Sequence, residues 1–194
     1  MSARESAHEA MDRFATGAIR VGRGTVAGFI GGAVAAWVMN RYQEMESRPV
    51  NVRREEERRQ DAGLPVKTRP VAQENQDGDP KVKVAQRVSR KLFEHELSPL
   101  EKKAAAPAVH YGVGATVGAL YGGLSELIPA VGAGFGIPYA TLVWLGGDEI
   151  VLPALGLTGP PTATTAEKHA SSLATHFVYG ISLDISRRIL RRVL

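Results

Sequence analysis

Apolar residues gather into four long stretches that are separated by charged segments or by turns. The stretches cover about residues 24–42, 107–129, 134–155 and 167–185. Each is close to the ~20 residues that a helix needs to cross a bilayer at ~1.5 Å per residue. The pattern therefore predicts an all-α fold, a polytopic membrane helical bundle with about four transmembrane helices plus amphipathic helices at the surface.

These stretches divide the chain into four segments. They are an N-terminal amphipathic segment (1–23), the first transmembrane helix (24–42), a hydrophilic linker with an amphipathic helix (43–106) and a three-span membrane domain with a basic C-terminal end (107–194). Asp148 and Glu149 interrupt the third span, and only a few small residues separate that span from the second. Helices joined so tightly run antiparallel as a hairpin.

The linker carries signals for two helices near its end. Residues 82–97 predict a basic amphipathic helix, whose apolar face is expected to contain Val84, Val88 and Leu92. The run Ser98-Pro99-Leu100-Glu101 then predicts the start of another helix, with Ser98 as its N-cap and Glu101 three residues later. Prolines and glycines between residues 65 and 80 predict an irregular segment before these helices.

Glycine recurs at every fourth position in two of the predicted spans. The first span has Gly24, Gly28 and Gly32, and the second has Gly114, Gly118 and Gly122. Residues four apart lie on one face of an α-helix. A face of small residues lets two helix backbones approach closely inside lipid. We therefore predict that these glycines are helix-packing positions, whose partner is a helix of the same chain or of another copy.

Four ionisable residues within the apolar stretches are candidates for a functional site. His110 and Glu126 stand at the two ends of the second glycine row, Glu149 lies in the third span and His176 in the fourth. Charged groups are costly in hydrocarbon, so these side chains are expected to face protein or a wet cavity. The simplest arrangement directs all four into one common interior.

Three interpretations of these residues stay open. Histidine and glutamate can hydrogen-bond across helices and fix the register of the bundle, at about 0.6 kcal/mol per contact. They can instead form a proton or ion path, because histidine titrates near neutral pH and intramembrane carboxylates mark relays. Two Glu and two His could also bind zinc, iron or manganese. Metal sites in bundles usually have Glu three residues before His, a spacing that these spans lack, so no metal and no cofactor is expected.

The distribution of charge favours a membrane over nucleic acid as the partner. The formal net charge of the 194-residue chain is +4. Fifteen of its 24 Lys and Arg lie in residues 41–106, whereas residues 107–186 hold one, Lys168. Basic residues that flank apolar stretches set membrane orientation. The lipid bilayer is therefore the expected partner and nucleic acid is not, with a second copy or other membrane proteins as partners for the glycine faces.

The composition also disfavours several classes of enzyme. The chain contains no cysteine, which excludes disulfides, thiolate catalysis and cysteine metal sites. Ser125 and Ser172 lie beside suitable residue types, but no nucleophile elbow or glycine-rich oxyanion loop accompanies them. The glycines recur at helical spacing and not in a phosphate-binding loop. We therefore do not expect an enzyme.

Arginines near both ends of the chain predict its orientation. Arg13, Arg20 and Arg23 precede the first span, and four arginines follow Ile185. Positive residues next to spans favour the cytoplasmic side, so both termini are expected to be cytoplasmic. The basic connection between the first two spans argues the other way, although long connections cross membranes with little regard to charge.

Several motifs resemble those of a known family. They are LSPLEKK at residues 97–103, PAVHYGVG at 107–114, GALYG at 118–122, DEIVLPALGL at 148–157 and HFVYG at 176–180. Together they resemble the YagU-like inner-membrane proteins of bacteria, a family whose domain has no established function. The first span also looks similar, whereas the charged linker between Val50 and Val82 does not match. The resemblance implies a multi-pass protein of the bacterial inner (cytoplasmic) membrane and draws attention to His110, Glu126, Glu149 and His176.

Two functional hypotheses follow from these observations. The first is a small integral inner-membrane protein of unassigned activity with a His/Glu-lined interior that handles protons or ions. The second is a structural or assembly subunit that docks onto other membrane proteins through its GxxxG faces. A relay needs the ionisable residues inside its own bundle, whereas an assembly role needs the glycines of residues 24–36 exposed to a partner.

Overall fold

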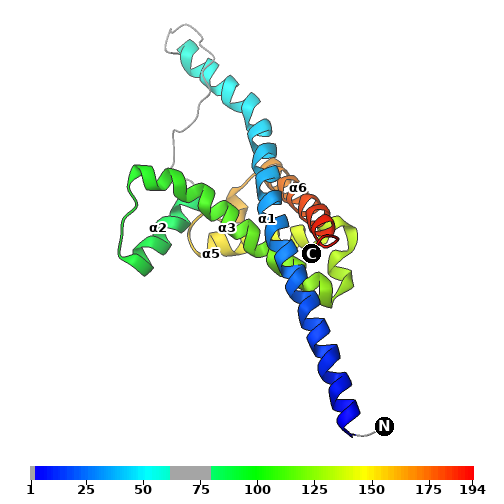
Figure 1. Cartoon of the computed structure of the whole chain (residues 1–194). Coiled ribbons are helices and arrows are strands. Elements are labelled where there is room, and N and C mark those ends of the chain that lie inside the picture. Colours follow the sequence, from blue (N-terminus) through cyan, green and yellow to red (C-terminus); the bar gives the residue numbers. More distant parts are fainter. Residues whose placement is uncertain (1–2, 62–79) are drawn as a thin grey trace.

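Every regular element in the part of the chain that the computed structural model describes, residues 3–61 and 80–194, is helical (Figure 1). The four principal helices are α1 (Ala3–Asp61), α2 (Pro80–Phe93), α3 (Pro99–Leu127) and α6 (Ala166–Leu190). The predicted all-α class is therefore confirmed for these residues. The irregular segment predicted between residues 65 and 80 lies almost entirely outside them.

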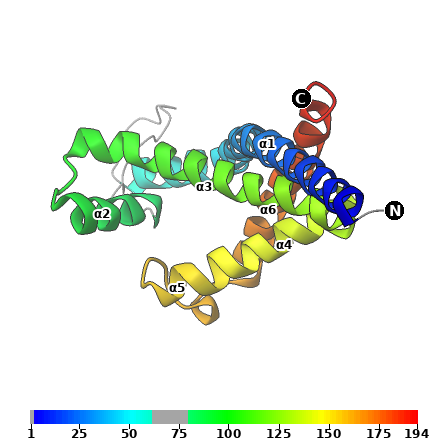
Figure 2. The same ribbon diagram turned by 60° about the horizontal axis from the view of Figure 1, so that its bottom comes forward.

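Shorter helical elements connect α3 to α6. They are the 3₁₀-helix η2 (Pro129–Gly136), α4 (Ile137–Trp144), the π-helix η3 (Leu145–Val151), α5 (Leu152–Ala154) and the 3₁₀-helix η4 (Pro161–Ala163). The chain reverses inside η2, where Gly134, Phe135 and Gly136 all have positive φ angles. The elements α4, η3 and α5 then continue in one direction as an arm (Figure 2).

Helix α1 is one continuous element of 59 residues. At ~1.5 Å per residue it is about 88 Å long, several times the thickness of a bilayer core. The expected amphipathic segment, the first span and the start of the linker all lie within it. Both ends of α1 extend beyond the remaining helices (Figure 1). The apolar middle packs against α3 and α6, whereas the charged ends project away from the bundle.

The predicted start of α3 is confirmed by its capping box. The Ser98 backbone N–H donates to Glu101 Oε2 at 2.7 Å, and the Glu101 N–H donates to Ser98 Oγ at 3.3 Å. Hydrogen bonds to its carboxylate from the Ser98 backbone, the Ser98 side chain and then the His95 ring lower the pKa of Glu101 from 4.5 to about 2, because each stabilises the ionised form. The cap fixes where α3 begins and hence the register of its glycines.

Helix α2 forms near the predicted place but turns a different face inward. It ends at Phe93, and Glu94 follows with a φ of 51°. Val82 is buried, whereas Val88, which was expected on the apolar face of this helix, is 47% exposed. The physical reason is a pair of long-range bonds: Arg87 donates to the Leu155 carbonyl at 2.6 Å and Lys83 to the Leu157 carbonyl at 3.4 Å, and they fix the rotation of α2.

The bundle interior combines alanines and tyrosines with one methionine and one leucine. The buried cluster comprises Ala35, Ala36, Met39, Tyr121, Tyr179 and Leu183. Large apolar side chains point outward instead, among them Phe29, Val34, Val113, Leu120, Leu142 and Ile181. Helix α6 contacts both α1 and α4 and lies between α1 and the arm (Figure 2). Soluble proteins normally bury such large apolar side chains, so this distribution is the reverse of a soluble core.

By length and composition, two helical stretches among the described residues could cross a membrane. They are Met11–Glu46 within α1 and Pro129–Ala154, which covers η2 and the arm. A buried helix of a soluble protein can pass the same test. In the second stretch, however, only 11% of the most apolar window is buried inside the protein. Its apolar surface therefore faces outward.

Candidate functional site

The two predicted rows of glycine face each other within one chain. Gly24 lies against Gly122, Gly28 against Gly118 and Gly32 against Gly114, so α1 and α3 run antiparallel. An added Cβ on Gly118 would lie 2.6 Å from the Gly32 Cα, and one on Gly32 would lie 2.9 Å from the Gly118 Cα. Side chains at these positions would overlap the facing backbone. We refer to these six glycines as the glycine seam.

One end of the glycine seam opens into a cavity of about 520 Å³. Three of the four predicted ionisable residues, His110, Glu149 and His176, line it. Further polar groups on its wall are Lys81, Asp148, Lys168, His169, Ser172 and Tyr179. The cavity therefore collects side chains from α1, α2, α3, the π-helix η3 and α6.

His110 and Tyr179 close the inner wall of the cavity at the glycine seam. His110 Nε2 lies 3.0 Å from the Ala36 carbonyl oxygen, so this nitrogen acts as the donor in the contact. The Tyr179 hydroxyl donates to the Gly114 carbonyl at 2.6 Å. Both bonds are possible because the small residues around them bring α1, α3 and α6 close together.

Two histidines of α6 each face a carboxylate of η3, and they form two histidine–carboxylate pairs. His169 Nδ1 lies 2.8 Å from Glu149 Oε1, and its Nε2 lies 3.1 Å from the Pro161 carbonyl oxygen. His176 Nδ1 lies 2.9 Å from the Ser172 carbonyl and 4.0 Å from Asp148 Oδ2. The Ser172 hydroxyl also donates to Asp148 Oδ2 at 2.8 Å, which ties the second pair together.

His169 is the most distinctive of these side chains, because both of its ring nitrogens face an oxygen acceptor. A neutral imidazole has one donor and one acceptor, so it can satisfy only one of the two contacts. The protonated ring has two donors and satisfies both. The geometry therefore suits a histidine that gains a proton when Glu149 is ionised.

The π-helix places the two carboxylates. Asp148 and Glu149 are consecutive residues of η3, and both reach α6. A π-helical turn is wider than an α-helical one, and such turns occur frequently at functional sites. Gly146 and Gly147 precede the acids, and a Cβ added at either glycine would meet no atom within 4 Å. Among the residues that the structure describes, no group of three or more His, Asp or Glu is placed to hold a metal ion.

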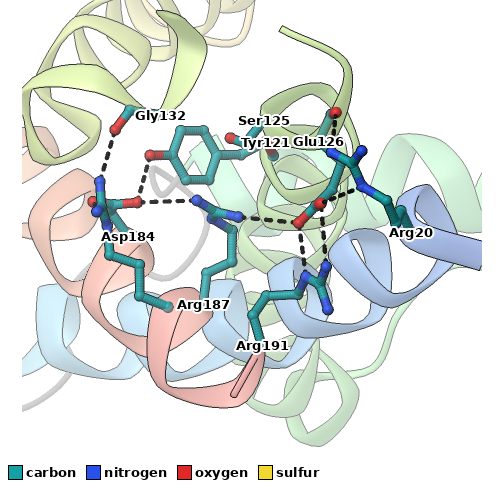
Figure 3. A network of polar contacts seen from close by, with 9 residues as sticks. Arg20, Tyr121, Ser125, Glu126, Gly132, Asp184, Arg187 and Arg191 are labelled. Atoms are coloured by element: carbon teal, nitrogen blue, oxygen red, sulfur yellow. Dashed lines mark hydrogen bonds and ion pairs between the residues drawn. The ribbon is translucent and has the colours of Figure 1, made fainter. Parts of the chain in front are cut away.

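Glu126 does not line the cavity but belongs to a separate network at the other end of the glycine seam (Figure 3). Arg191 binds it through Nε at 2.7 Å and Nη2 at 3.2 Å. Arg187 Nη1 lies 3.5 Å away and Arg20 Nε 3.8 Å away from its carboxylate. The expectation of one common interior was therefore wrong, since the length of α3 separates His110 from Glu126.

Asp184 is the second acid of this network, and its side chain is fully buried. The Tyr121 hydroxyl donates to Oδ1 at 2.9 Å, and Arg188 Nε donates to Oδ2 at 2.7 Å. Arg187 lies between the two acids, with Nη2 3.6 Å from Asp184 (Figure 3). We call Arg20, Arg187, Arg188 and Arg191, with Glu126 and Asp184, the arginine cluster.

Sequence reasoning gave His169, Asp148 and Asp184 less weight and did not place them among the candidate site residues. Signals for two of them existed: His169 lies seven residues before His176 on nearly the same helical face, and Asp184 precedes Arg188 by four. The bond between Asp184 and Tyr121 joins residues 63 positions apart, and no local pattern indicates it.

One family model matches the chain. It is described as "Protein of unknown function (DUF1440)" and covers residues 65–185. No curated protein and no solved structure matches the chain. The matched region contains the cavity carboxylates, both cavity histidine pairs and the α3 side of the glycine seam. The α1 side of the seam and Arg20 lie before it.

Proposed function

The chain belongs to the DUF1440 family, whose function is unknown, and we propose from its own residues that it is a four-span membrane protein that takes up and releases protons at the histidine–carboxylate pairs of its cavity. The four spans are the middle of α1, α3 from Pro107 to its end, the α4–α5 arm and α6. The proposed location is the bacterial inner membrane, in keeping with the resemblance to YagU-like proteins.

The surface of the helices supports the membrane placement. Large apolar residues of α1, α3, the arm and α6 face outward, while glycine, tyrosine and ionisable residues face inward. Backbone contact through glycine rows is the packing mode of helices in lipid. An apolar exterior of this extent would be a liability for a soluble monomer.

The arrangement of charge supports an orientation with both termini in the cytoplasm. Arg20 before the first span and the arginines at the end of α6 contact the same carboxylate, Glu126. These basic residues therefore stand at one level of the bundle. Positive residues beside spans concentrate on the cytoplasmic side.

The observation that carries the proposal is His169 held between Glu149 and the Pro161 carbonyl. Its ring and the carboxylate share a position where one proton can be held by either partner. His176 and Asp148 lie 4.0 Å apart in the same cavity, and His176 Nδ1 is bonded to the Ser172 carbonyl. Histidine changes its charge in the physiological range, and a neighbouring carboxylate moves that change across neutral pH.

The alternative, an assembly subunit that docks through its GxxxG faces, loses its main support. Gly24, Gly28 and Gly32 lie against the backbone of α3 in the same chain. A partner helix could reach this face only by displacing α3. The outward apolar surface of the helices stays available for lipid.

Proton flux into liposomes tests the proposal. Full-length protein is reconstituted into vesicles that contain a pH-sensitive dye, and an inward proton gradient is applied. We expect wild-type vesicles to acidify faster than empty ones, and Glu149→Gln and His169→Gln to lose this flux because an amide cannot titrate.

The pair formed by His95 and Glu101, 3.1 Å apart, offers a matched control. Both side chains are about half exposed and lie outside the cavity. The variant His95→Gln should keep the wild-type flux. Wild-type vesicles no more permeable than empty ones, or an equal loss in His95→Gln, would overturn the proposal.

A further inference from the structure

The arginine cluster carries more positive charge than its internal partners require. Three arginines, Arg20, Arg187 and Arg191, surround the single carboxylate of Glu126. Arg187 is shared with Asp184, which has its own partner in Arg188. Four guanidinium groups thus meet two carboxylates, and two positive charges remain uncompensated within the cluster.

From this imbalance we propose that the Glu126 end of the arginine cluster binds the phosphate of an anionic phospholipid headgroup. Arg20 and Arg191 supply the donors. Guanidinium is the side chain best suited to phosphate, because its planar set of five N–H donors matches the phosphate oxygens.

Exposure to solvent distinguishes the arginine that stabilises the interior from the two arginines that can contact a ligand. The Arg187 side chain is 11% exposed and lies between the two acids, so it serves the interior. The Arg20 side chain is 61% exposed and that of Arg191 is 22% exposed. Arg20 meets Glu126 through Nε and Nη2, which leaves the outer part of its guanidinium group for a ligand.

Neutralisation of Glu126 alone does not explain three arginines. One bidentate partner, Arg191, already satisfies both carboxylate oxygens at 2.7 and 3.2 Å. Each further cation brought to the same carboxylate is repelled by the arginines already there. An anion from outside the protein would remove this repulsion.

The position of the cluster favours a lipid as the source of the phosphate. It joins the place where the apolar part of α1 begins to the ends of α3 and α6, which is headgroup depth in the proposed four-span arrangement. Leu124 and Leu127, on either side of Glu126, are 39% and 63% exposed and provide an apolar surface for acyl chains. The inference rests on the proposed membrane placement but is independent of proton handling.

Binding can be measured with full-length protein in neutral detergent. Thermal unfolding and native mass spectrometry are followed while phosphatidylglycerol or phosphatidylcholine is added to the micelles. We expect phosphatidylglycerol to bind more tightly and to raise the unfolding temperature more. A hydrogen bond to a charged group contributes about tenfold in affinity, so Arg20→Gln should weaken phosphatidylglycerol binding by about that factor.

Two further variants distinguish a specific phosphate site from general attraction between basic residues and anionic lipid. Arg20→Lys keeps the charge and should retain most of the affinity. Arg23→Gln removes the same charge less than one turn away on α1, where the residue is exposed and outside the cluster, and should leave binding unchanged. A loss in Arg23→Gln equal to that in Arg20→Gln would overturn the proposal, as would equal binding of the two lipids.

Inorganic phosphate distinguishes the source of the anion. If phosphate alone raises the unfolding temperature as much as phosphatidylglycerol does, the ligand is a soluble anion and the lipid proposal fails. Flotation with phosphatidylcholine vesicles separately tests the membrane placement. Protein that fails to float with them contradicts the four-span arrangement itself, whereas floating without a lipid preference contradicts only the headgroup site.

Discussion

Tyr121 and Tyr111 are two tyrosines of α3 that differ in what their hydroxyl groups contact. Tyr121 is fully buried, and its hydroxyl donates to the buried Asp184 at 2.9 Å. Tyr111 packs partly buried against the same apolar cluster, with its ring 5.5 Å from that of His110. Tyr→Phe at the two positions therefore isolates the bond between the Tyr121 hydroxyl and Asp184, because both substitutions keep the aromatic ring.

Tyr121→Phe should lower the free energy of unfolding by about 1.5–3 kcal/mol, because it removes a hydrogen bond to a charged group and leaves Asp184 with less compensation. Tyr111→Phe should change it by less than about 0.5 kcal/mol. Denaturant unfolding of the full chain in detergent measures both. Equal effects of the two substitutions would mean that the Asp184 bond contributes nothing specific.

The stability of the first turn of α3 depends on pH through the side chain of Glu101. Hydrogen bonds from Ser98 and then His95 lower its pKa from 4.5 to about 2. A carboxyl group with a lowered folded-state pKa stabilises the fold above its unfolded value, and this contribution is lost as the pH falls from 4.5 through 2.

We therefore expect amide protection in the first turn of α3 to decrease over that pH range in wild type. Glu101→Gln should show protection that does not depend on pH, because its neutral amide oxygen can still accept from the Ser98 N–H. The turn of α3 around Thr116 is an internal control, because no acidic residue lies within four positions of it. Hydrogen exchange, corrected for the intrinsic rate at each pH, makes the comparison. Parallel loss in both turns would indicate general unfolding.

At the scale of elements, the glycine seam fixes how closely α1 and α3 approach. A Cβ on Gly28 would overlap the Gly118 carbonyl oxygen and lie 2.8 Å from the Gly122 Cα. The obstacle is backbone, which cannot turn aside as a flexible side chain can. Gly22 lies on the same helix, and a Cβ there would meet nothing within 4 Å.

Gly28→Ala should therefore destabilise the bundle by about 1–3 kcal/mol, the usual cost of overpacking. Gly22→Ala should be neutral or stabilise by up to about 1 kcal/mol, because alanine favours the helix. Thermal unfolding in detergent compares the two single-methyl additions. A Gly28→Ala protein as stable as wild type would mean that α1 and α3 can separate without loss.

Local patterns predicted the elements well where the cause is local. The Ser98–Glu101 cap needs only neighbouring residues, and the four-residue spacing of glycine is visible without a structure. The rotation of α2 about its axis was not predictable in this way, because it depends on the bond from Arg87 to the Leu155 carbonyl, 68 residues away. The π-helical turn that aims Asp148 and Glu149 at α6 depends on backbone geometry rather than on hydrophobic periodicity.

At the scale of the whole molecule, ionisable groups are sorted into two levels. The histidine–carboxylate pairs gather at the cavity, and the arginine cluster gathers at the other end of the glycine seam. The sequence identifies which face of a helix each residue occupies. It does not identify the level, because that depends on which helices run antiparallel and where their ends meet. For this reason Glu126 was expected in the same interior as the two histidines, whereas it lies in the arginine cluster.

The positions of these two groups of residues predict which loops and termini share a compartment. Arg20, Glu126 and Arg191 are in contact at one level, whereas His110 and Gly159 line the cavity at the other. If α1, α3, the arm and α6 all span the bilayer, the loop near Gly159 faces the opposite compartment from both termini.

Compartment reporters fused before Met1, after Leu194 or inserted at Gly159 measure this directly. We expect the terminal reporters to agree with each other and to differ from the Gly159 reporter. The arm is the span that this experiment tests most directly, because the chain reverses at Gly134–Gly136 just before it and because it contains the π-helical turn. If the arm enters the membrane and returns without crossing it, α3 and α6 still cross, and the two termini then lie on opposite sides. That result would contradict both the four-span arrangement and the contact between Arg191 and Glu126, while leaving the glycine seam intact.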